Sequence, residues 1–357
     1  MQVRGFAAAA ILVLAPSVPL GAQWINLPTP GIPRTPDGKP NLSAPAPKTA
    51  DGKPDLSGIW TMNAGRYAMN IVADLKPEEI KPWAEKLFQE RRENLGKDSP
   101  FTGCLPEGSA MNLNPVAMVR IVQTPTIVAY LSEYLTNRTI HLDGRKLPVD
   151  PNPSFMGYSV GHWDGDTLVV ESIGFNDRTW LDFGGHPHSE SLRVTERIRR
   201  RDFGHLDIEE TLTDPNTYTR PWTIKITANL IADTEIIEYI CAENEKDRQH
   251  LVGTASDDKH RAVKVAPALL AKYAGTYDFR FPENPTQPIP IPIVLSEGQL
   301  VVDFFGDKRP LTPLSDTVFS SEGNPVTFVT NERGVVTHLI IQAAEGDLRA
   351  NRLPDKK

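Results

Sequence analysis

The residues most suited to chemistry gather in one stretch, between positions 174 and 191. It contains two histidines, an arginine, a tryptophan and four acidic or amide side chains: Asn176, Asp177, Arg178, Trp180, Asp182, His186, His188 and Glu190. Segments of this length without secondary structure tend to be binding or active-site loops. The stretch therefore predicts where a functional site lies.

One chemistry that these residues allow is general acid–base catalysis. His188 would act as the general base, because an imidazole changes its protonation near neutral pH. Asp177 or Asp182 would orient the imidazole, and Arg178 would hold a substrate carboxylate or enolate. A protein with this arrangement would be a lyase, an isomerase or a hydrolase.

A second chemistry is metal binding. His186 and His188 are one residue apart, so an extended segment could place both imidazoles on one side. Asp182 or Glu190 would supply a third ligand. The His-x-His spacing has low specificity, and we predict no metal. In a third interpretation the loop is structural, with an ion pair between its neighbouring Asp and Arg residues and with histidines that cap backbone groups.

The stretch before the loop contains a serine in the motif GYSVG, at 157–161. This spacing matches the nucleophile elbow, in which a serine stands between a strand and a helix. Here Ser159 is followed by more strand pattern and a turn, and so we predict no catalytic serine. Residues 157–173 instead predict a β-hairpin.

The hairpin would bring polar residues together on one face. A two-residue turn at 164–165 places Tyr158 opposite Glu171, with His162 on the same face. If this face lines a barrel lumen, burial could tune Glu171 for acid–base work; the alternative is a mixed face toward solvent. The more apolar opposite face is predicted to be core: Ser159, Gly161, Trp163, Leu168 and Val170. With two tryptophans as apolar or sugar-stacking walls, the predicted ligand-binding residues are Tyr158, His162, Trp163, Trp180 and Asp182.

The elements that would position these residues are mostly strands. Alternating apolar and polar residues predict strands at 58–60, 118–122, 126–133, 138–142, 192–200, 205–213, 222–230 and 236–241, with the hairpin at 157–174 between the fourth and fifth of these. No helical pattern separates them, which argues against a parallel α/β sheet. Many short strands in sequential hairpins predict an antiparallel β domain over 58–258, either a barrel or a sandwich.

One helix is predicted in this domain, at 76–95. Pro82 moves its expected start toward residue 81, because proline is tolerated only in the first turn. Apolar residues at helical spacing form one face: Ile80, Trp83, Ala84, Leu87 and Phe88.

A charged segment at 243–264 precedes a second predicted β domain, at 266–353. Strands are predicted at 275–279, 291–296, 299–304, 318–320, 325–330 and 335–343, with turns at 297–298 and 333–334. The sequences LLAKYAGTYDF (269–279), LSEGQLVV (295–302) and FVTNERGVVTHL (328–339) resemble the lipocalin-like β module appended to secreted bacterial serine hydrolases. The resemblance implies an accessory lipocalin-like domain and brings no catalytic residue with it.

The chain begins with a pattern typical of a secretory signal, at residues 1–22. A Pro-rich arm follows at 23–57, with an internal echo of PDGKPNLS (36–43) in ADGKPDLS (50–57). The motifs DGKPDLSGIW (51–60), GHWDGDTLVVE (161–171), FNDRTWLD (175–182) and HPHSE (186–190) resemble a family of exported bacterial proteins. That resemblance implies export and no particular reaction.

Composition limits the partners and cofactors. The formal net charge of −7, with both signs interspersed, argues against nucleic acid or an anionic membrane as a partner. Cys104 and Cys241 predict a disulfide in an exported protein, with two buried free thiols as the alternative. No phosphate-cradling glycine loop, zinc cysteine pattern or dinucleotide fingerprint occurs, so no cofactor is predicted. Nothing in the sequence indicates the oligomeric state.

Together these patterns predict an exported β-barrel protein that binds a small molecule or glycan under the 174–191 loop. The alternative is a lyase, isomerase or hydrolase at the same place, using His188, an acidic partner and Arg178, with Glu171 nearby. A passive scaffold for other proteins is a third possibility, which the specialised composition of the loop disfavours.

Overall fold

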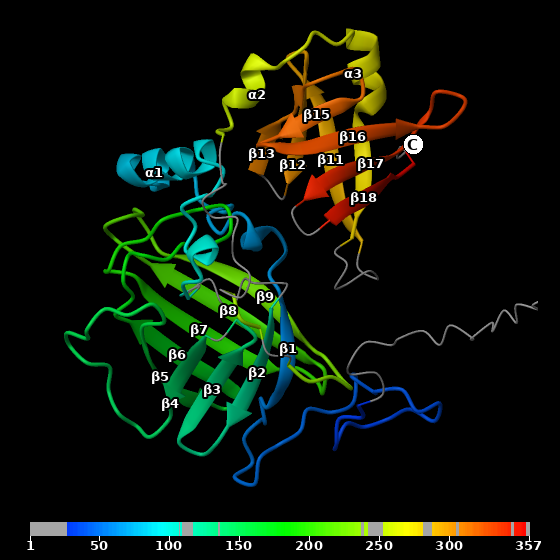
Figure 1. Ribbon diagram of the computed structural model, residues 1–357. Helices are drawn as coiled ribbons and strands as arrows, with labels where there is room; N and C mark the ends of the chain where they lie inside the picture. The colour runs from blue at the N-terminus through cyan, green and yellow to red at the C-terminus, as the bar shows by residue number, and fades with distance from the viewer. Residues whose placement is uncertain are drawn as a thin grey trace, which may run out of the picture.

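The computed structural model describes residues 27–354, apart from 107, 109–116, 135, 237–238, 242–252, 281–287, 305–306 and 344–345. The predicted signal segment at 1–22 and the first part of the charged segment at 243–264 lie outside these residues. Within them the chain forms two sheets of nine strands each, so the all-β prediction is confirmed (Figure 1). None of the helices in the described part has the length and apolarity that a membrane crossing needs.

The first sheet closes into a barrel whose strands follow sequence order, which decides between barrel and sandwich. The strands are β1 (Gly58–Asn63), β2 (Met118–Gln123), β3 (Ile127–Ser132), β4 (Asn137–His141), β5 (Tyr158–Asp164), β6 (Thr167–Ile173), β7 (Arg193–Arg200), β8 (His205–Thr213) and β9 (Trp222–Leu230). β9 pairs with β1 and closes the barrel. The residues of 236–241 that the structure describes form no strand, although one was predicted there.

One neighbouring pair of strands runs parallel, where we expected only antiparallel pairs. Nine strands in sequence order cannot alternate in direction all the way around a closed barrel, so one pair must run the same way. β4 and β5 are that pair, with Ile140 beside Ser159 and His141 beside Val160. Parallel neighbours need a crossover connection, and residues 142–157 provide it.

The β5–β6 hairpin has the predicted strands but a different turn. Its central residues are Gly165 and Asp166, and only Gly165 has a positive φ, of 60°. This is the pattern of a type II′ turn, in which glycine takes the first central position. Tyr158 therefore lies opposite Ile173 rather than Glu171, and the predicted pairing was wrong by two positions. A shift of two leaves every side chain on its predicted face.

The two ends of the barrel carry different connections (Figure 1). The strand directions place the β1–β2, β6–β7 and β8–β9 connections together at one end, which we call the loop end. The β1–β2 connection contributes α1 (Pro82–Glu93) and the 3₁₀ turns η1 (Gly65–Ala68), η2 (Pro77–Glu79) and η3 (Phe101–Gly103). At the opposite end the arm crosses the β7–β8 turn, where the Gly204 N–H donates to the Leu42 carbonyl at 2.8 Å.

The helix α1 is shorter than the predicted helix at 76–95. Pro82 is its first residue, as the sequence indicated, because a proline N–H is not needed there. The residues before it form a separate turn, η2, since a proline inside a helix breaks the hydrogen bonding. On α1 the buried side chains are Ala84, Phe88 and Arg91, whereas Trp83 is 44% exposed.

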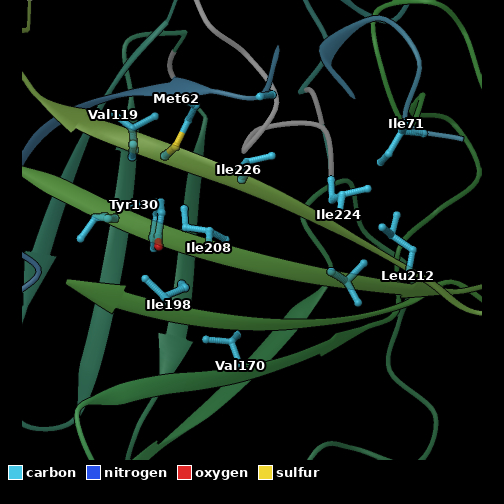
Figure 2. Close-up of a cluster of buried hydrophobic side chains, with 14 of the residues drawn as sticks. Met62, Ile71, Val119, Tyr130, Val170, Ile198, Ile208, Leu212, Ile224 and Ile226 are labelled. Carbon is cyan, nitrogen blue, oxygen red and sulfur yellow. The ribbon is translucent and has the colours of Figure 1, made fainter. Parts of the chain in front are cut away.

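Apolar side chains fill the interior of the barrel. In β7, β8 and β9 alternate residues are buried, as the period-two pattern predicts. Figure 2 shows part of this core, to which the β1–β2 connection contributes Ile71 and the strands contribute Met62, Val119, Tyr130, Val170, Ile198, Ile208, Leu212, Ile224 and Ile226. The hydroxyl of Tyr130 lies among these apolar groups.

The two copies of the repeated motif in the arm also have the same local structure. In the first copy the Thr35 N–H donates to the Lys39 carbonyl at 2.9 Å, and in the second the Thr49 N–H donates to Lys53 at 2.8 Å. The glycine of each DGK motif has a positive φ, of 83° and 80°. Leu56, near the end of the second copy, is fully buried in the barrel core. The arm is thus two successive tight turns, the second of which leads into the core.

The second sheet contains β10 (Gly275–Phe279), β11 (Ile289–Ser296), β12 (Gln299–Phe304), β13 (Asp307–Pro310), β14 (Thr312–Pro313), β15 (Val318–Ser321), β16 (Asn324–Thr330), β17 (Val336–Ala343) and β18 (Gly346–Arg352). β13 and β14 form its two edges. Only Leu311 separates them in the chain, so the sheet must curl until its edges meet. The sequence did not predict β13, β14 or β18.

Two short helices precede this sheet, α2 (Asp257–His260) and α3 (Pro267–Tyr273). α3 adds Leu270 and Tyr273 to a second apolar core, separate from that of the barrel. The predicted turn at 297–298 is confirmed: Glu297 and Gly298 have φ values of 48° and 81°, as a type I′ turn requires.

Two contacts tie distant segments together. Cys104, after η3, and Cys241, after β9, form the predicted disulfide. By closing a loop with a sequence separation of 137 residues, it would stabilise the fold by roughly 4–5 kcal/mol through restriction of the unfolded chain. α1 also reaches the second sheet, because Arg92 pairs with Glu322 in the β15–β16 turn.

Candidate functional site

The 174–191 loop is packed into the loop end of the barrel. Its central residues are buried: Thr179, Trp180, Leu181, Asp182, His186 and His188. Asp214, from the β8–β9 connection, anchors its last part by accepting bonds from the Ser189 N–H at 2.6 Å and the Ser189 hydroxyl at 2.7 Å. The Tyr218 hydroxyl donates to the Pro187 carbonyl at 2.8 Å. The loop is therefore a built part of the fold and not an exposed flap.

Asp182 organises the middle of the loop. One carboxylate oxygen accepts the backbone N–H groups of Gly185 and His186, at 2.9 and 3.1 Å. The other accepts the Ile71 N–H at 2.7 Å and His186 Nδ1 at 2.6 Å. Four donors therefore hold one buried carboxylate and fix both the turn and the imidazole that follows it.

His186 is consequently held in one orientation. Its ring stacks on Phe88 of α1, with centroids 3.9 Å apart and planes 15° apart. Because an ionised carboxylate only accepts, Nδ1 carries the proton that is shared with Asp182. Nε2 makes no hydrogen bond with any residue that the structure describes, and it is not completely shielded from solvent. This nitrogen is available to a ligand or to a proton.

Arg91, one turn after Phe88 on α1, faces the same part of the loop. Its Nη1 donates to the Gly185 carbonyl at 2.8 Å, and its guanidinium lies 4.8 Å from the ring centre of Trp180. Nε is fully buried and has no hydrogen-bond partner among the described residues. Burial lowers the pKa of Arg91, against the smaller opposing effects of Asp98, Tyr218 and Asp182. We call Phe88, Arg91, Trp180, Asp182 and His186 the α1–loop site.

His188, the predicted general base, has both ring nitrogens occupied. The Ser189 carbonyl accepts a bond from Nδ1 at 3.1 Å, so Nε2 is the acceptor for the Thr179 hydroxyl, at 2.7 Å. Burial lowers the pKa of His188. Burial favours the neutral form of the ring, which is fixed between a hydroxyl and a carbonyl. This is a structural role for His188, as expected if the loop is structural rather than catalytic.

The other predicted catalytic residues do not converge on His188. Asp177, Arg178 and Glu171 are all exposed. Arg178 lies over the ring of Phe155, 5.0 Å from its centre. Glu171 points outward from the barrel, so the lumen face that we considered for it is the outer face. The hydrogen-bonded set of base, acid and arginine proposed from the sequence is therefore not assembled around His188.

The predicted ligand-binding residues fall into three places. His162 and Tyr158 lie on the outer face of β5, exposed and half-buried respectively. Trp163 is half-buried and packs against the barrel core. Trp180 and Asp182 belong to the α1–loop site. Of the metal candidates, Glu190 is exposed, and within the described part of the chain no three His, Cys, Asp or Glu side chains gather in a way that could hold a metal ion.

A second charged group, which the sequence analysis did not identify, lies inside the barrel. Arg138 of β4 donates to Glu196 of β7 at 3.0 Å, to Ser159 at 3.1 Å and to Ser172 at 2.8 Å. Burial is the largest single influence on the pKa of Arg138 and would lower it, but the charge and hydrogen bonds of Glu196, with smaller contributions from Tyr130 and Glu210, together raise that pKa. Tyr130 lies beside this group, and its hydroxyl has no partner in the described structure.

The alternation of the strands contained a signal for this group. Arg138 shares its face of β4 with Ile140, and Glu196 stands between Val194 and Ile198 on β7. All three apolar neighbours are core residues. A charge at a core position of an alternating strand predicts a buried ion pair, provided that a partner of opposite sign occupies the same face elsewhere.

Comparison with known proteins adds little to this description. No family model matches the chain, and no curated protein matches it in sequence. Crystal structures of the fluorescent protein UnaG, as a mutant and as the wild type, are similar at 16% and 14% identity. Each match covers 50% of this chain and 97% of that chain, with TM-scores of 0.25 and 0.23. TM-scores this low do not establish a shared fold. The barrel assignment therefore rests on the strand pairing.

Proposed function

We propose that this protein is an exported small-molecule-binding protein whose ligand occupies the α1–loop site. The proposal is supported by two polar nitrogens in a largely buried place that have no hydrogen-bond partner among the residues that the structure describes. These are Nε of Arg91 and Nε2 of His186. Buried polar groups are normally hydrogen-bonded, and an exception calls for an explanation such as a ligand.

The surroundings of these two groups match those of small-molecule sites. Such sites combine apolar and aromatic walls with a few placed polar groups. Here Phe88 and Trp180 supply aromatic surface, and Asp182 fixes the imidazole of His186. The disulfide supports export, because disulfides persist in oxidising compartments. The two family resemblances remain predictions.

A thermal-shift screen of the full chain tests the proposal. The panel would contain organic acids, amines, neutral aromatic compounds and sugars, so that glycans are included. A ligand that binds only the folded state raises Tm, and at a concentration of 100 times Kd it stabilises the fold by about 2.7 kcal/mol. We expect hits for the wild type, loss of those hits in His186→Gln, and retention in the exposed control His260→Gln. A panel without hits, or hits that persist in His186→Gln, would contradict the proposal.

A second candidate function is general acid–base catalysis at the same atoms, and the Asp182–His186 geometry favours it. A histidine whose Nδ1 is held by a carboxylate and whose Nε2 is free is the arrangement that proton transfer needs. His186 then takes the role that the sequence analysis gave to His188. Mass spectrometry of each bound compound after incubation tests this function. Conversion by the wild type and none by His186→Gln would support catalysis. If no compound is converted, catalysis is ruled out for that panel and the protein only binds these compounds.

A further inference from the structure

The hydrogen bonds of three buried arginines reveal which edge of each guanidinium is occupied. A guanidinium can grip a carboxylate with two parallel bonds along one edge, for example the edge formed by Nε and Nη2. In Arg138 that edge is filled, because Nε donates to Ser159 and Nη2 donates to Ser172 and Glu196. The ion pair inside the barrel is therefore complete.

Arg200, at the end of the barrel opposite the loop end, also has all of its guanidinium nitrogens bonded. Its Nε donates to the Asp202 carbonyl at 3.3 Å, and Nη2 donates to the Phe203 carbonyl. Nη1 donates to the Asp55 carbonyl of the arm. The rings of Trp60 and Phe203 lie 5.0 and 5.1 Å from its guanidinium. Burial lowers its pKa to about 10, yet each of its nitrogens has a carbonyl partner.

Arg91 differs from both of these arginines. Nη1 is taken by the Gly185 carbonyl, while neither Nε nor Nη2 bonds to any residue that the structure describes. The free edge is the Nε–Nη2 edge, in which two N–H bonds point in parallel. Trp180 covers one face of the guanidinium and helps to hold its plane. A planar acceptor with two oxygens matches the direction of these two donors.

We propose that the ligand of the α1–loop site is an organic carboxylate, whose two oxygens bind the Nε–Nη2 edge of Arg91. This proposal rests on the proposed function, since it names the ligand class of the same site. His186 Nε2 lies free on the neighbouring loop and takes a second polar group of the ligand. The aromatic rings of Phe88 and Trp180 make an aromatic acid the natural first probe.

The acidic residues around Arg91 leave this edge free. Asp182 is occupied by four donors and does not bond to Arg91. Asp98 is exposed, bonds to the Asn94 amide at 3.3 Å and acts on Arg91 only through its charge. The carboxylate of a ligand would bring to Arg91 the hydrogen-bonded negative charge that the described part of the protein does not provide.

Matched pairs of compounds test the proposal on the full chain by isothermal titration calorimetry. Benzoate is compared with benzamide, and phenylacetate with phenylacetamide, which have the same shape without the charge. We expect carboxylates to bind at least about tenfold more tightly than their amides, the effect of one or two charge-assisted bonds. Arg91→Gln should weaken carboxylate binding about 100-fold, and Arg91→Lys, which keeps the charge but not the paired donors, about tenfold. The exposed control Arg199→Gln should bind like the wild type.

Three other outcomes would contradict the carboxylate proposal. If the amides or neutral sugars bind as well as the carboxylates, or if Arg91→Gln binds benzoate like the wild type, the carboxylate proposal is wrong while small-molecule binding stands. If inorganic phosphate binds more tightly than every carboxylate, the site is an anion site of another class. If the full screening panel gives no hit, the proposed function fails and this proposal fails with it. Circular dichroism of each Arg91 variant checks that the fold is kept.

Discussion

Arg138 in the barrel and Arg91 on α1 are both buried arginines, but they differ in how many hydrogen-bond partners the protein provides for the guanidinium. Arg138 is bonded to a carboxylate and two hydroxyls, and its pKa is raised despite burial, mainly by the charge and hydrogen bonds of Glu196. Arg91 is bonded to one backbone carbonyl, and burial lowers its pKa. The first charge is compensated by the fold, and the second is compensated only in part.

This difference separates a structural charge from a functional one. A complete buried ion pair needs no explanation outside the fold, although removing one partner leaves an uncompensated charge. A buried charge with an unused donor weakens the fold. We infer that such a group is kept for a partner that the chain itself does not supply. The distinction is tested by measuring how the free energy of unfolding changes when each charge, or a charge near it, is removed.

The largest effect is expected from Glu196→Gln. The substitution removes from the barrel interior the carboxylate to which Arg138 is hydrogen-bonded, and breaking a buried pair in this way costs about 3–5 kcal/mol. Urea unfolding, followed by tryptophan fluorescence, should show that loss in the free energy of unfolding. Glu209→Gln is the matched control, because Glu209 is the neighbouring glutamate on the outer face of β8 and pairs with Lys225 in solvent. The control should lose less than about 1 kcal/mol, and equal losses would remove the distinction.

The strands of the barrel were predictable because alternation is a local property. β7, β8 and β9 alternate strictly between buried and less buried residues, and the sequence placed all three. The turn between β5 and β6 was misplaced because Asp164-Gly165 and Gly165-Asp166 both have turn chemistry. Only the full pairing of the two strands selects between them. The parallel β4–β5 pair depends on the number of strands that close the barrel, which no local pattern contains.

The sequence predicted where the candidate site lies but not which of its side chains contact one another. Composition identified the 174–191 loop and included Asp182, His186 and Trp180 among its candidates. The choice of His188 as the base was not supported by the geometry, because the partner of each histidine is set by contacts made across the fold. The Ile71 N–H and Phe88, both over ninety residues away, help to fix Asp182 and His186. Arg91 could have been found by extending the buried face of α1 one turn beyond Phe88.

The next largest effect concerns His188, which separates the structural part of the loop from the α1–loop site. Burial lowers the pKa of His188, although Asp214 and Asp177 oppose this and Arg91 reinforces it. Below about pH 6.5 the unfolded chain binds a proton at this residue that the folded chain does not. The free energy of unfolding should therefore fall as the pH drops from about 6.5, with a contribution of up to about 1.4 kcal/mol per pH unit.

His188→Gln removes this contribution, so its stability should depend less on pH than that of the wild type. Urea unfolding between pH 5 and 8 measures the difference between the two proteins at each pH. His260→Gln is the control, because His260 is exposed on α2. Parallel profiles for the wild type and His188→Gln would show that the buried imidazole does not resist protonation.

A smaller effect is expected at Arg92, the neighbour of Arg91 on α1. Arg92 pairs with Glu322, which Arg309 also contacts at 3.0 Å. The side chains of Arg92 and Glu322 are 18% and 22% exposed, between a buried pair and a surface pair. Glu322→Gln should therefore lower the free energy of unfolding by about 1 kcal/mol, and this loss should shrink in 1 M NaCl, because salt screens such pairs. A loss that does not change with salt would assign the effect to packing.

The smallest effect on stability is expected from Arg91→Met. Methionine has a similar length and keeps an apolar contact with Trp180, so the losses are the bond to the Gly185 carbonyl and a cation–π contact. These losses are offset because the substitution also removes a buried charge with an unpartnered Nε. The free energy of unfolding should change by no more than about 1 kcal/mol in either direction, whereas Arg138→Met should lose about 3–5 kcal/mol in the same urea experiment. If Arg91→Met costs as much as Arg138→Met, Arg91 is a structural residue and its free edge no longer argues for a ligand.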